Sequence, residues 1–247
     1  MIRSLGDQIF SALIGALVTL VLTWIGRRIQ INGTKRMWRL RRPDRLRIVL
    51  STSARIETPT YFRPVTGLGG ARALSLLTPS LARAYRIPDG VAMLSSLVED
   101  RDREGDLILL GGPKNNEVTR EALARLDRRL PVTMRTEGDE KIYRRTSWNS
   151  EDEALPPPSG QAPSHGRAGA DYGLIIRAPN CFNSETTLMI FAGQHTYGII
   201  AAAQYFLTHQ REMRKMSHRN FALVVKSAVT AKEHVEPPEL YCGPFFF

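Results

Sequence analysis

The stretch DLILLGGPKNNEVT, residues 106–119, decides which fold the sequence predicts. After its first residue it runs through four apolar residues, a Gly-Gly-Pro and a Lys-Asn-Asn, and a helical pattern begins near Glu117. This order predicts a buried strand, a glycine turn and a helix N-terminus with Asn116 as the N-cap. In an open α/β sheet, such a junction is where ligands bind.

A second copy of this order lies at residues 187–206, TLMIFAGQHTYGIIAAAQYF. An apolar strand again leads into a polar loop, residues 193–198, and then into an alanine-rich helix. Further short strands are predicted at residues 45–53, 172–177 and 221–225. This alternation of strands and helices predicts an α/β domain with a Rossmann-like, largely parallel sheet and helices on both faces.

The N-terminal segment contains an uncharged apolar run, IFSALIGALVTLVLTWIG, at residues 9–26. Its 18 residues are close to the minimum for a single transmembrane helix, and Trp24 stands where an interfacial aromatic residue is expected. A cleaved signal peptide and a buried helix are the alternatives. A signal peptide would have a more basic start and a small-residue cleavage site, so the run favours a retained membrane anchor.

Basic residues are concentrated directly after this run. Residues 27–47 contain nine Lys or Arg and one Asp, for a local formal charge of +8, whereas residues 48–247 are nearly neutral at +2. Because Lys and Arg stay on the cytoplasmic side, the cluster predicts a single-pass protein of the cell membrane with its C-terminal domain in the cytoplasm. The cluster also suits anionic lipid head groups, and no nucleic acid partner is expected.

The predicted organisation has three parts. Residues 1–26 carry the transmembrane helix, residues 27–44 form a basic juxtamembrane linker, and residues 45–247 form the cytoplasmic α/β domain. Residues 149–169, rich in Pro, Gly and Ser, are predicted to be a flexible insertion in that domain, with a linker between two domains as the alternative. The apolar C-terminus GPFFF either docks on the domain or marks a partner contact.

Three further local predictions concern the region before residue 146. Residues 54–66, which contain prolines, are expected to form an ordered loop. The pattern at residues 71–85 predicts a helix that Pro79 kinks or breaks. Residues 132–145 alternate in polarity and predict a hairpin that turns at Glu-Gly-Asp.

Four polar loops are expected to meet at the carboxyl edge of this sheet, at residues 51–53, 111–116, 180–183 and 193–198. Their glycines let a ligand approach the backbone, and their amides and one lysine can bind a base, a sugar or a phosphate. The predicted ligand is small and nucleotide-like, although caps and turns also explain these residues. The predicted binding residues are Gly111, Gly112, Lys114, Asn115, Asn116, Asn180, Asn183, Gly193, Gln194, Thr196 and Gly198.

Two residues are candidates for acid or base catalysis, namely His195 between a predicted strand and helix and Glu117 in a first helical turn. A loop hydrogen bond and a helix-start charge explain them equally well. Cys181 has no basic neighbour in the sequence, which argues against a nucleophile. Neither metal-ligand spacing nor a P-loop pattern is present, and Gly67-Leu68-Gly69 matches a dinucleotide fingerprint only in part, so the cofactor stays open.

Two phrases carry a resemblance to known families: LILLGGPKNNEVT, and YGLIIRAPNCFN followed by LMIFAG. They resemble membrane-tethered Rossmann-like sensor or effector domains of bacterial defence and signalling operons, which implies a domain that senses or processes a nucleotide signal. They also resemble the C-terminal domain of archaeal surface-layer proteins, against which the inward-facing basic cluster argues. The match covers residues 106–120 and 172–198 and implies no catalytic residue.

The expected function is a membrane-anchored cytoplasmic domain that binds a small nucleotide-like ligand as a sensor or signalling module. The first alternative is a hydrolase or transferase that acts on a nucleoside or nucleotide. The second alternative is a structural or scaffold protein whose Rossmann-like fold holds no ligand.

Overall fold

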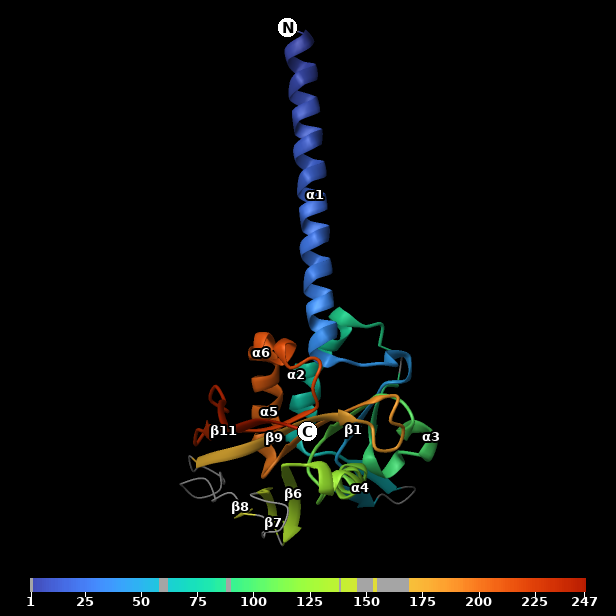
Figure 1. Cartoon of the computed structure of the whole chain (residues 1–247), viewed down its shortest axis with the longest axis vertical. Coiled ribbons are helices and arrows are strands. Elements are labelled where there is room, and N and C mark those ends of the chain that lie inside the picture. The colour runs from blue at the N-terminus through green and yellow to red at the C-terminus, as the bar shows by residue number, and fades with distance from the viewer. Residues whose placement is uncertain (1, 58–61, 88–89, 138, 146–152, 155–168) are drawn as a thin grey trace.

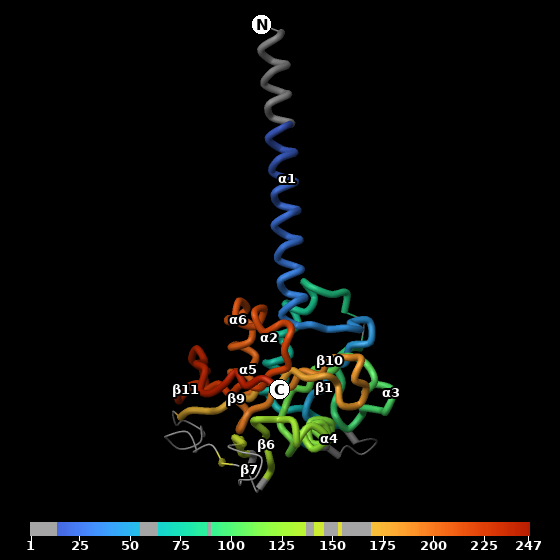
Figure 2. The backbone as a smooth tube through the Cα atoms, in the orientation of Figure 1, coloured from blue at the N-terminus to red at the C-terminus, as the bar shows by residue number. Residues whose placement is uncertain are grey.

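The computed structural model describes residues 2–57, 62–87, 90–137, 139–145, 153–154 and 169–247. Figures 1 and 2 show one long helix that projects from a mixed α/β domain. The insertion predicted at residues 149–169 lies mostly outside the described residues. Within it, the structure describes residue 169 and strand β8 (Glu153–Ala154), which pairs with β7 (Asp139–Arg144).

Helix α1 (Ile2–Trp38) is the projecting element and has 37 residues. At about 1.5 Å per residue it is about 55 Å long, which exceeds the thickness of a bilayer core. Its segment Ile14–Trp38 is long and apolar enough, by length and composition, to cross a membrane. Leu17, Leu20 and Leu22 are 62%, 67% and 63% exposed, so the described part of the domain does not cover them.

A seven-stranded sheet forms the centre of the domain, in the order β12-β11-β9-β10-β5-β1-β4. The strands at one end are mutually parallel: β1 (Arg47–Leu50), β4 (Ala92–Leu94), β5 (Leu107–Leu110) and β10 (Thr187–Gly193). The strands at the other end pair in antiparallel fashion: β9 (Gly169–Pro179), β11 (Phe221–Val229) and β12 (Glu239–Phe246). The predicted α/β class is confirmed, and four of the seven strands are parallel to one another.

Packed elements cover both faces of the sheet. One face packs against α2 (Leu68–Ala84), α5 (Thr196–Thr208), α6 (Gln210–Lys215) and the end of α1. The other face packs against α4 (Glu117–Leu126) and the hairpin of β6 (Val132–Glu137) and β7. Because both faces are covered, every residue of β5 is buried, which explains its continuous apolar run.

Shorter elements complete the domain. They are the hairpin of β2 (Ala54–Glu57) and β3 (Phe62–Val65), helix α3 (Asp100–Arg103) and the 3-10 turns Pro43–Arg45, Ser95–Leu97 and Asp127–Arg129. The prediction of an ordered loop at residues 54–66 is therefore wrong, because β2 and β3 pair there. Pro64 lies in β3, a strand of a two-stranded sheet, where a missing N–H is tolerated at an edge.

Other local predictions are confirmed. Asn116 caps α4, because its Oδ1 accepts a hydrogen bond from Thr119 N at 3.1 Å. The hairpin expected at residues 132–145 is formed by β6 and β7. The apolar C-terminus docks on the domain, since it belongs to β12 and pairs with β11.

Helix α2 begins earlier than predicted, and of the two effects predicted for Pro79, a kink or a break, the break does not occur. It begins at Leu68, before the expected start at residue 71, and continues through Pro79 to Ala84. A proline in a helix interior costs about 3 kcal/mol. The side chains of Leu77 and Leu81 are fully buried on either side of it, and each burial contributes about 1.5–3 kcal/mol. This burial offsets the lost hydrogen bond, so the helix is not broken.

The end of α1 is part of the domain core. Trp38 is fully buried, and its ring lies edge-on to that of Phe206 with the ring centroids 4.7 Å apart. Its Nε1 donates a hydrogen bond to Ser80 Oγ of α2 at 3.0 Å. Arg177 of β9 donates from Nη1 to the carbonyl oxygen of Met37 at 3.0 Å. The helix is thus attached to both α2 and the sheet.

Arg177 also joins α1 to the end of α6. Its Nη2 donates to the carbonyl oxygens of Met216 and, at 2.9 Å, of Arg219. The side chain is 1% exposed, and burial, with a smaller effect of nearby Arg39, lowers its pKa to about 9. Arg177 therefore stays charged at neutral pH, and the carbonyls at two helix C-termini supply the opposing partial charge.

The burial of Trp38 gives a stability prediction. Trp38→Ala leaves a cavity between α1, α2 and α5 and is expected to lower the free energy of unfolding by about 3–5 kcal/mol. The measurement is urea denaturation of the full chain in detergent micelles, followed by circular dichroism. Trp24→Ala is the control, because Trp24 is 59% exposed on α1. Equal losses for the two variants would contradict the packing described.

Candidate functional site

The carboxyl ends of β1, β5 and β10 lie side by side at one edge of the sheet. The chain leaves β1 for β4 on one side of it and later returns to β5 on the other side, so the strand order reverses here. In open α/β sheets, ligands bind outside the carboxyl ends of the strands at such a point. The structure has a pocket of about 240 Å³ at this position.

The pocket combines the loops after three strands with the start of α2. Six of the residues that line it are site residues predicted from the sequence: Gly112, Lys114, Asn115, Gln194, His195 and Thr196. Seven more line it and do not belong to the predicted set: Ser51, Ser53, Thr66, Gly67, Gly69, Gly70 and Ile199. The serines at the end of β1 and the Thr-Gly-Leu-Gly-Gly phrase are the sequence signals for six of them, and the seventh, Ile199, belongs to α5.

The start of α2 reaches the pocket without a side-chain cap. Its N-cap is Gly67, and among the described residues no side chain caps its first backbone N–H groups. A Cβ at Gly69 would lie 2.4 Å from the backbone oxygen of Thr196, so only glycine fits there between α2 and α5. In the part of the chain that the structure describes, the buried Thr66 Oγ1 has no hydrogen-bond partner. An open helix N-terminus of this kind favours negative charge.

The start of α5, on the other side of the pocket, already holds a carboxylate. Asp171 of β9 is fully buried, and its Oδ2 accepts a hydrogen bond from Gly198 N at 2.6 Å. Its Oδ1 accepts from His195 N at 3.1 Å and lies 3.3 Å from His195 Nδ1. Asp171 thus caps α5 from β9. Of the two helix N-termini at the pocket, the one that remains open to an anion is therefore that of α2.

The two candidate catalytic residues are not brought together. His195 lines the pocket with its side chain 33% exposed. Glu117 is exposed in the first turn of α4, which packs on the opposite face of the sheet from α2, and it does not line the pocket. The structure instead pairs His195 with Asp171, and a carboxylate beside an imidazole nitrogen orients the ring.

Four predicted binding residues lie behind the pocket wall, where all are buried: Gly111, Asn116, Gly193 and Gly198. Gly111 has φ +121°, and a Cβ there would lie 1.7 Å from a serine oxygen at the end of β1. At Gly193 and Gly198 a Cβ would lie 2.3 Å and 2.0 Å from backbone atoms. Asn116 Nδ2 donates to the carbonyl oxygens at the ends of β1 and β5. These residues shape the edge and do not line the pocket.

Asn180 and Asn183 lie at the opposite edge of the sheet, which corrects their predicted placement. Strand β9 runs antiparallel to β10, so the loop after Pro179 lies beside the amino ends of the parallel strands. Asn180 Nδ2 donates to the backbone oxygen of Gly105 at 2.9 Å, and Asn183 Nδ2 donates to that of Glu104 at 2.9 Å. Both amides hold the turn that precedes β5.

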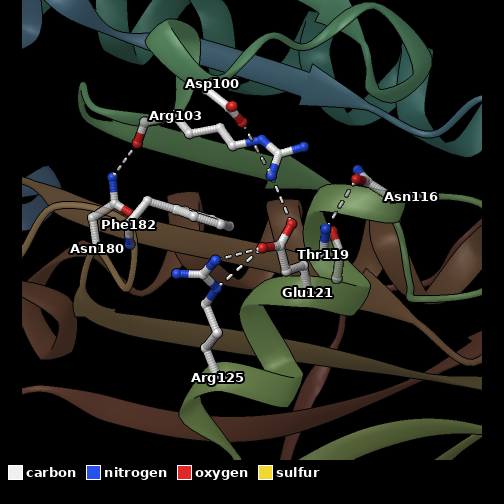
Figure 3. A network of polar contacts seen from close by, with 8 residues as sticks. All are labelled: Asp100, Arg103, Asn116, Thr119, Glu121, Arg125, Asn180 and Phe182. Atoms are coloured by element: carbon white, nitrogen blue, oxygen red, sulfur yellow. Dashed lines mark hydrogen bonds and ion pairs between the residues drawn. The ribbon is translucent and has the colours of Figure 1, made fainter.

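A polar network connects the loop after Pro179 and helix α3 to α4 (Figure 3). Glu121 accepts hydrogen bonds from Arg103 Nη1 at 2.6 Å and from Arg125 Nη2 at 2.7 Å. The ring of Phe182 lies 5.4 Å and 4.8 Å from the guanidinium carbons of the same two arginines. A cavity of about 840 Å³ adjoins this network. Although it is larger than the pocket beside α2, it lies away from the reversal of strand order and from the helix N-termini.

The chemistry of the pocket rests on polar side chains and backbone groups. Among the described residues, no group of three or more His, Cys, Asp or Glu side chains is placed to hold a metal ion. The two cysteines lie outside the pocket, and burial raises the pKa of both thiols, that of Cys181 to about 11. At neutral pH both are thiols rather than thiolates, and a thiol is a poor nucleophile.

Comparisons with known proteins supply no family: no protein-family model and no curated protein matches the chain. Function is therefore inferred from the site itself. The pocket offers the backbone N–H groups of α2, the ammonium group of Lys114 and the amides of Asn115 and Gln194, together with the Asp171–His195 pair.

The raised pKa of Cys181 gives a pH-dependent prediction. In the Cys242→Ser chain at pH 8, iodoacetamide is expected to modify Cys181 about a hundredfold more slowly than in the urea-unfolded chain, because little thiolate is present. The rate should rise about tenfold per pH unit and level off near pH 11. Mass spectrometry of the modified peptide measures it. A folded-state rate equal to the unfolded one at pH 8 would contradict the burial described.

Proposed function

We propose that this chain is a membrane-anchored, Rossmann-like domain that binds a small nucleotide-like ligand in the pocket beside α2 and acts as a sensor or signalling module. The observation that carries the proposal is the uncapped N-terminus of α2, which lies in that pocket together with Lys114. The order β4-β1-β5-β10, with the reversal at β1, is also the order of doubly wound sheets that bind nucleotides.

Each part of the pocket suits one part of such a ligand. The start of α2 suits a phosphate, because backbone N–H groups and the helix dipole favour an anion there and Lys114 adds a positive charge. Gly67 and Gly69 carry no side chain, so the phosphate can approach the backbone. Asn115 and Gln194 offer amide donors and acceptors to a base or a sugar.

The proposal also places α1 across the cell membrane and the domain in the cytoplasm. The exposed apolar stretch of α1 and the basic residues after it support this orientation. A cleaved signal peptide is disfavoured, because α1 continues unbroken from the apolar stretch to the buried Trp38. Residues 27–47 are proposed to contact anionic lipid head groups. Arg42 and Arg47 are exceptions, since Arg42 Nη2 lies 3.6 Å from Glu185 Oε2 and Arg47 Nε lies 2.9 Å from Asp102 Oδ1.

A thermal-shift screen of the full chain in detergent micelles tests ligand binding. At least one nucleotide is expected to raise the melting temperature, because a ligand that binds only the folded state stabilises it. Lys114→Gln removes one charge from the pocket and is expected to weaken binding about tenfold, or about 1.4 kcal/mol.

The control for this screen is Arg128→Gln, which removes an exposed charge outside the pocket and should leave the affinity unchanged. The proposal fails if no nucleotide shifts the melting temperature of the wild-type chain. It also fails if the two variants lose affinity equally, because the positive charge would then act from a distance rather than in the pocket.

The Asp171–His195 pair favours a second function, a hydrolase or transferase that acts on a nucleoside or nucleotide. The carboxylate lies 3.3 Å from His195 Nδ1 and orients an imidazole that can act as an acid or a base. Ser51 and Ser53 line the same pocket and supply hydroxyl groups to it. The proton transfer would contribute about 10²–10⁴-fold to the rate.

His195→Gln separates this enzyme from a binding module. If the pocket is catalytic, the variant is expected to lose turnover of a nucleoside or nucleotide at least about a hundredfold while it still binds the substrate. Product release from the full chain, measured by chromatography, is the readout. His218→Gln is the matched control, because His218 is exposed and outside the pocket. Absence of turnover in the wild-type chain would rule out the enzyme for the substrates tested.

A further inference from the structure

Basic residues are found on three elements that meet where α1 enters the domain. They come from three parts of the chain: the end of α1, the end of α2 with the residues after it, and α6. We name this set the basic collar, which consists of Lys35, Arg83, Arg86, Arg211, Arg214 and Lys215. The sequence predicts residues 27–47 as a basic cluster, but only the fold adds α2 and α6 to it.

The collar contacts α1 on two flanks. On one flank, the guanidinium of Arg214 from α6 lies against Gly33, where a Cβ would be 2.9 Å from Nη1, and Figure 1 shows α6 beside the lower end of α1. On the other flank, Tyr85 OH donates a hydrogen bond to the carbonyl oxygen of Lys35 at 3.1 Å. The two attachment points are two residues apart on α1, which is about 3 Å along the helix axis. Both flanks therefore meet α1 at the same height.

This height matches the head-group layer of a membrane. Gly33 follows Gly26, the end of the predicted span, by about 10 Å along the helix. The head-group region extends about 5–8 Å beyond the hydrocarbon core on each side. Charges near an anionic surface act over a Debye length, which is about 8 Å at physiological ionic strength. The collar thus lies within reach of the lipid head groups.

The basic residues of α6 carry more positive charge than the described residues around them pair with. Arg211 and Lys215 are exposed, and in the part of the chain that the structure describes neither forms an ion pair. Glu212 is the acidic residue of this helix. The basic residues beside α4 differ, since Arg103 and Arg125 both pair with Glu121. The unpaired positive charge therefore faces the side of the domain from which α1 projects.

We propose that the basic collar docks the domain on anionic lipid head groups, so that α6 and the end of α2 contact the membrane surface together with the exposed basic residues at positions 27–36 of α1. This inference rests on the proposed membrane span of α1. Helix α2 has 17 residues, and at about 1.5 Å per residue it separates its collar end from its pocket end by about 25 Å. Docking thus holds the pocket away from the lipid and open to the cytoplasm.

The experiment is hydrogen–deuterium exchange of the full chain in lipid nanodiscs. In discs that contain phosphatidylserine, exchange at residues 208–219 is expected to be at least about fivefold slower than in pure phosphatidylcholine, since each Lys or Arg near an anionic surface contributes about fivefold to binding. The protection should disappear at high salt. Inorganic phosphate added to the neutral discs should not reproduce it.

Matched variants separate docking from general electrostatics. Arg211→Gln with Lys215→Gln is expected to abolish the protection, whereas Arg128→Gln with Arg129→Gln removes the same charge from exposed sites beside α4 and should preserve it. Equal exchange in both lipids, with the chain still in the disc, overturns the docking and leaves the span intact. If the chain does not stay in the disc, the span and the docking are both overturned. Protection by phosphate alone also overturns the docking.

Discussion

Arg177 is a buried cation on β9 of the sheet, and it forms hydrogen bonds with the ends of α1 and α6. Its guanidinium lies 4.6 Å from the ring centre of Phe221 and donates to backbone carbonyls at the ends of two helices. A buried charge without hydrogen-bond partners is costly. If either α1 or α6 moved away, the guanidinium of Arg177 would remain buried with fewer carbonyl partners, so both helices are held in place. The contact holds the end of α1 and the end of α6 on the face of the sheet that α2 and α5 also cover.

The sequence predicts well those features that depend on neighbours along the chain. The run at residues 107–110 is a buried strand because both of its faces are covered, and Asn116 caps the next helix because its side chain reaches a backbone N–H three residues on. Hydrophobic periodicity and cap chemistry are local signals of this kind. They bring the loops at Gly112 and Gln194 to one edge, and both loops line the pocket.

Features that depend on residues far apart in the sequence cannot be predicted in this way. An apolar run such as residues 172–177 has the same pattern whether its strand runs parallel or antiparallel, so the placement of Asn180 could not be read from it. Asp171 caps a helix that begins 25 positions later, and no spacing rule connects the two. The pattern places the start of α2 three residues too late, because glycines lower the helix propensity of its first turn. Gly69 is nevertheless required there, since α2 packs closely against Thr196.

Helix α2 links the two ends of the domain as one rod. Its first turn borders the pocket, and near its last turn Ser80 accepts a hydrogen bond from the indole of Trp38. The pocket end of α2 and the residue that anchors α1 therefore belong to one helix, with no loop between them. Pro79 has no N–H group, so one backbone hydrogen bond of this helix is absent one residue before Ser80. A proline is the usual site at which a helix bends, and this one lies between the two ends that α2 connects.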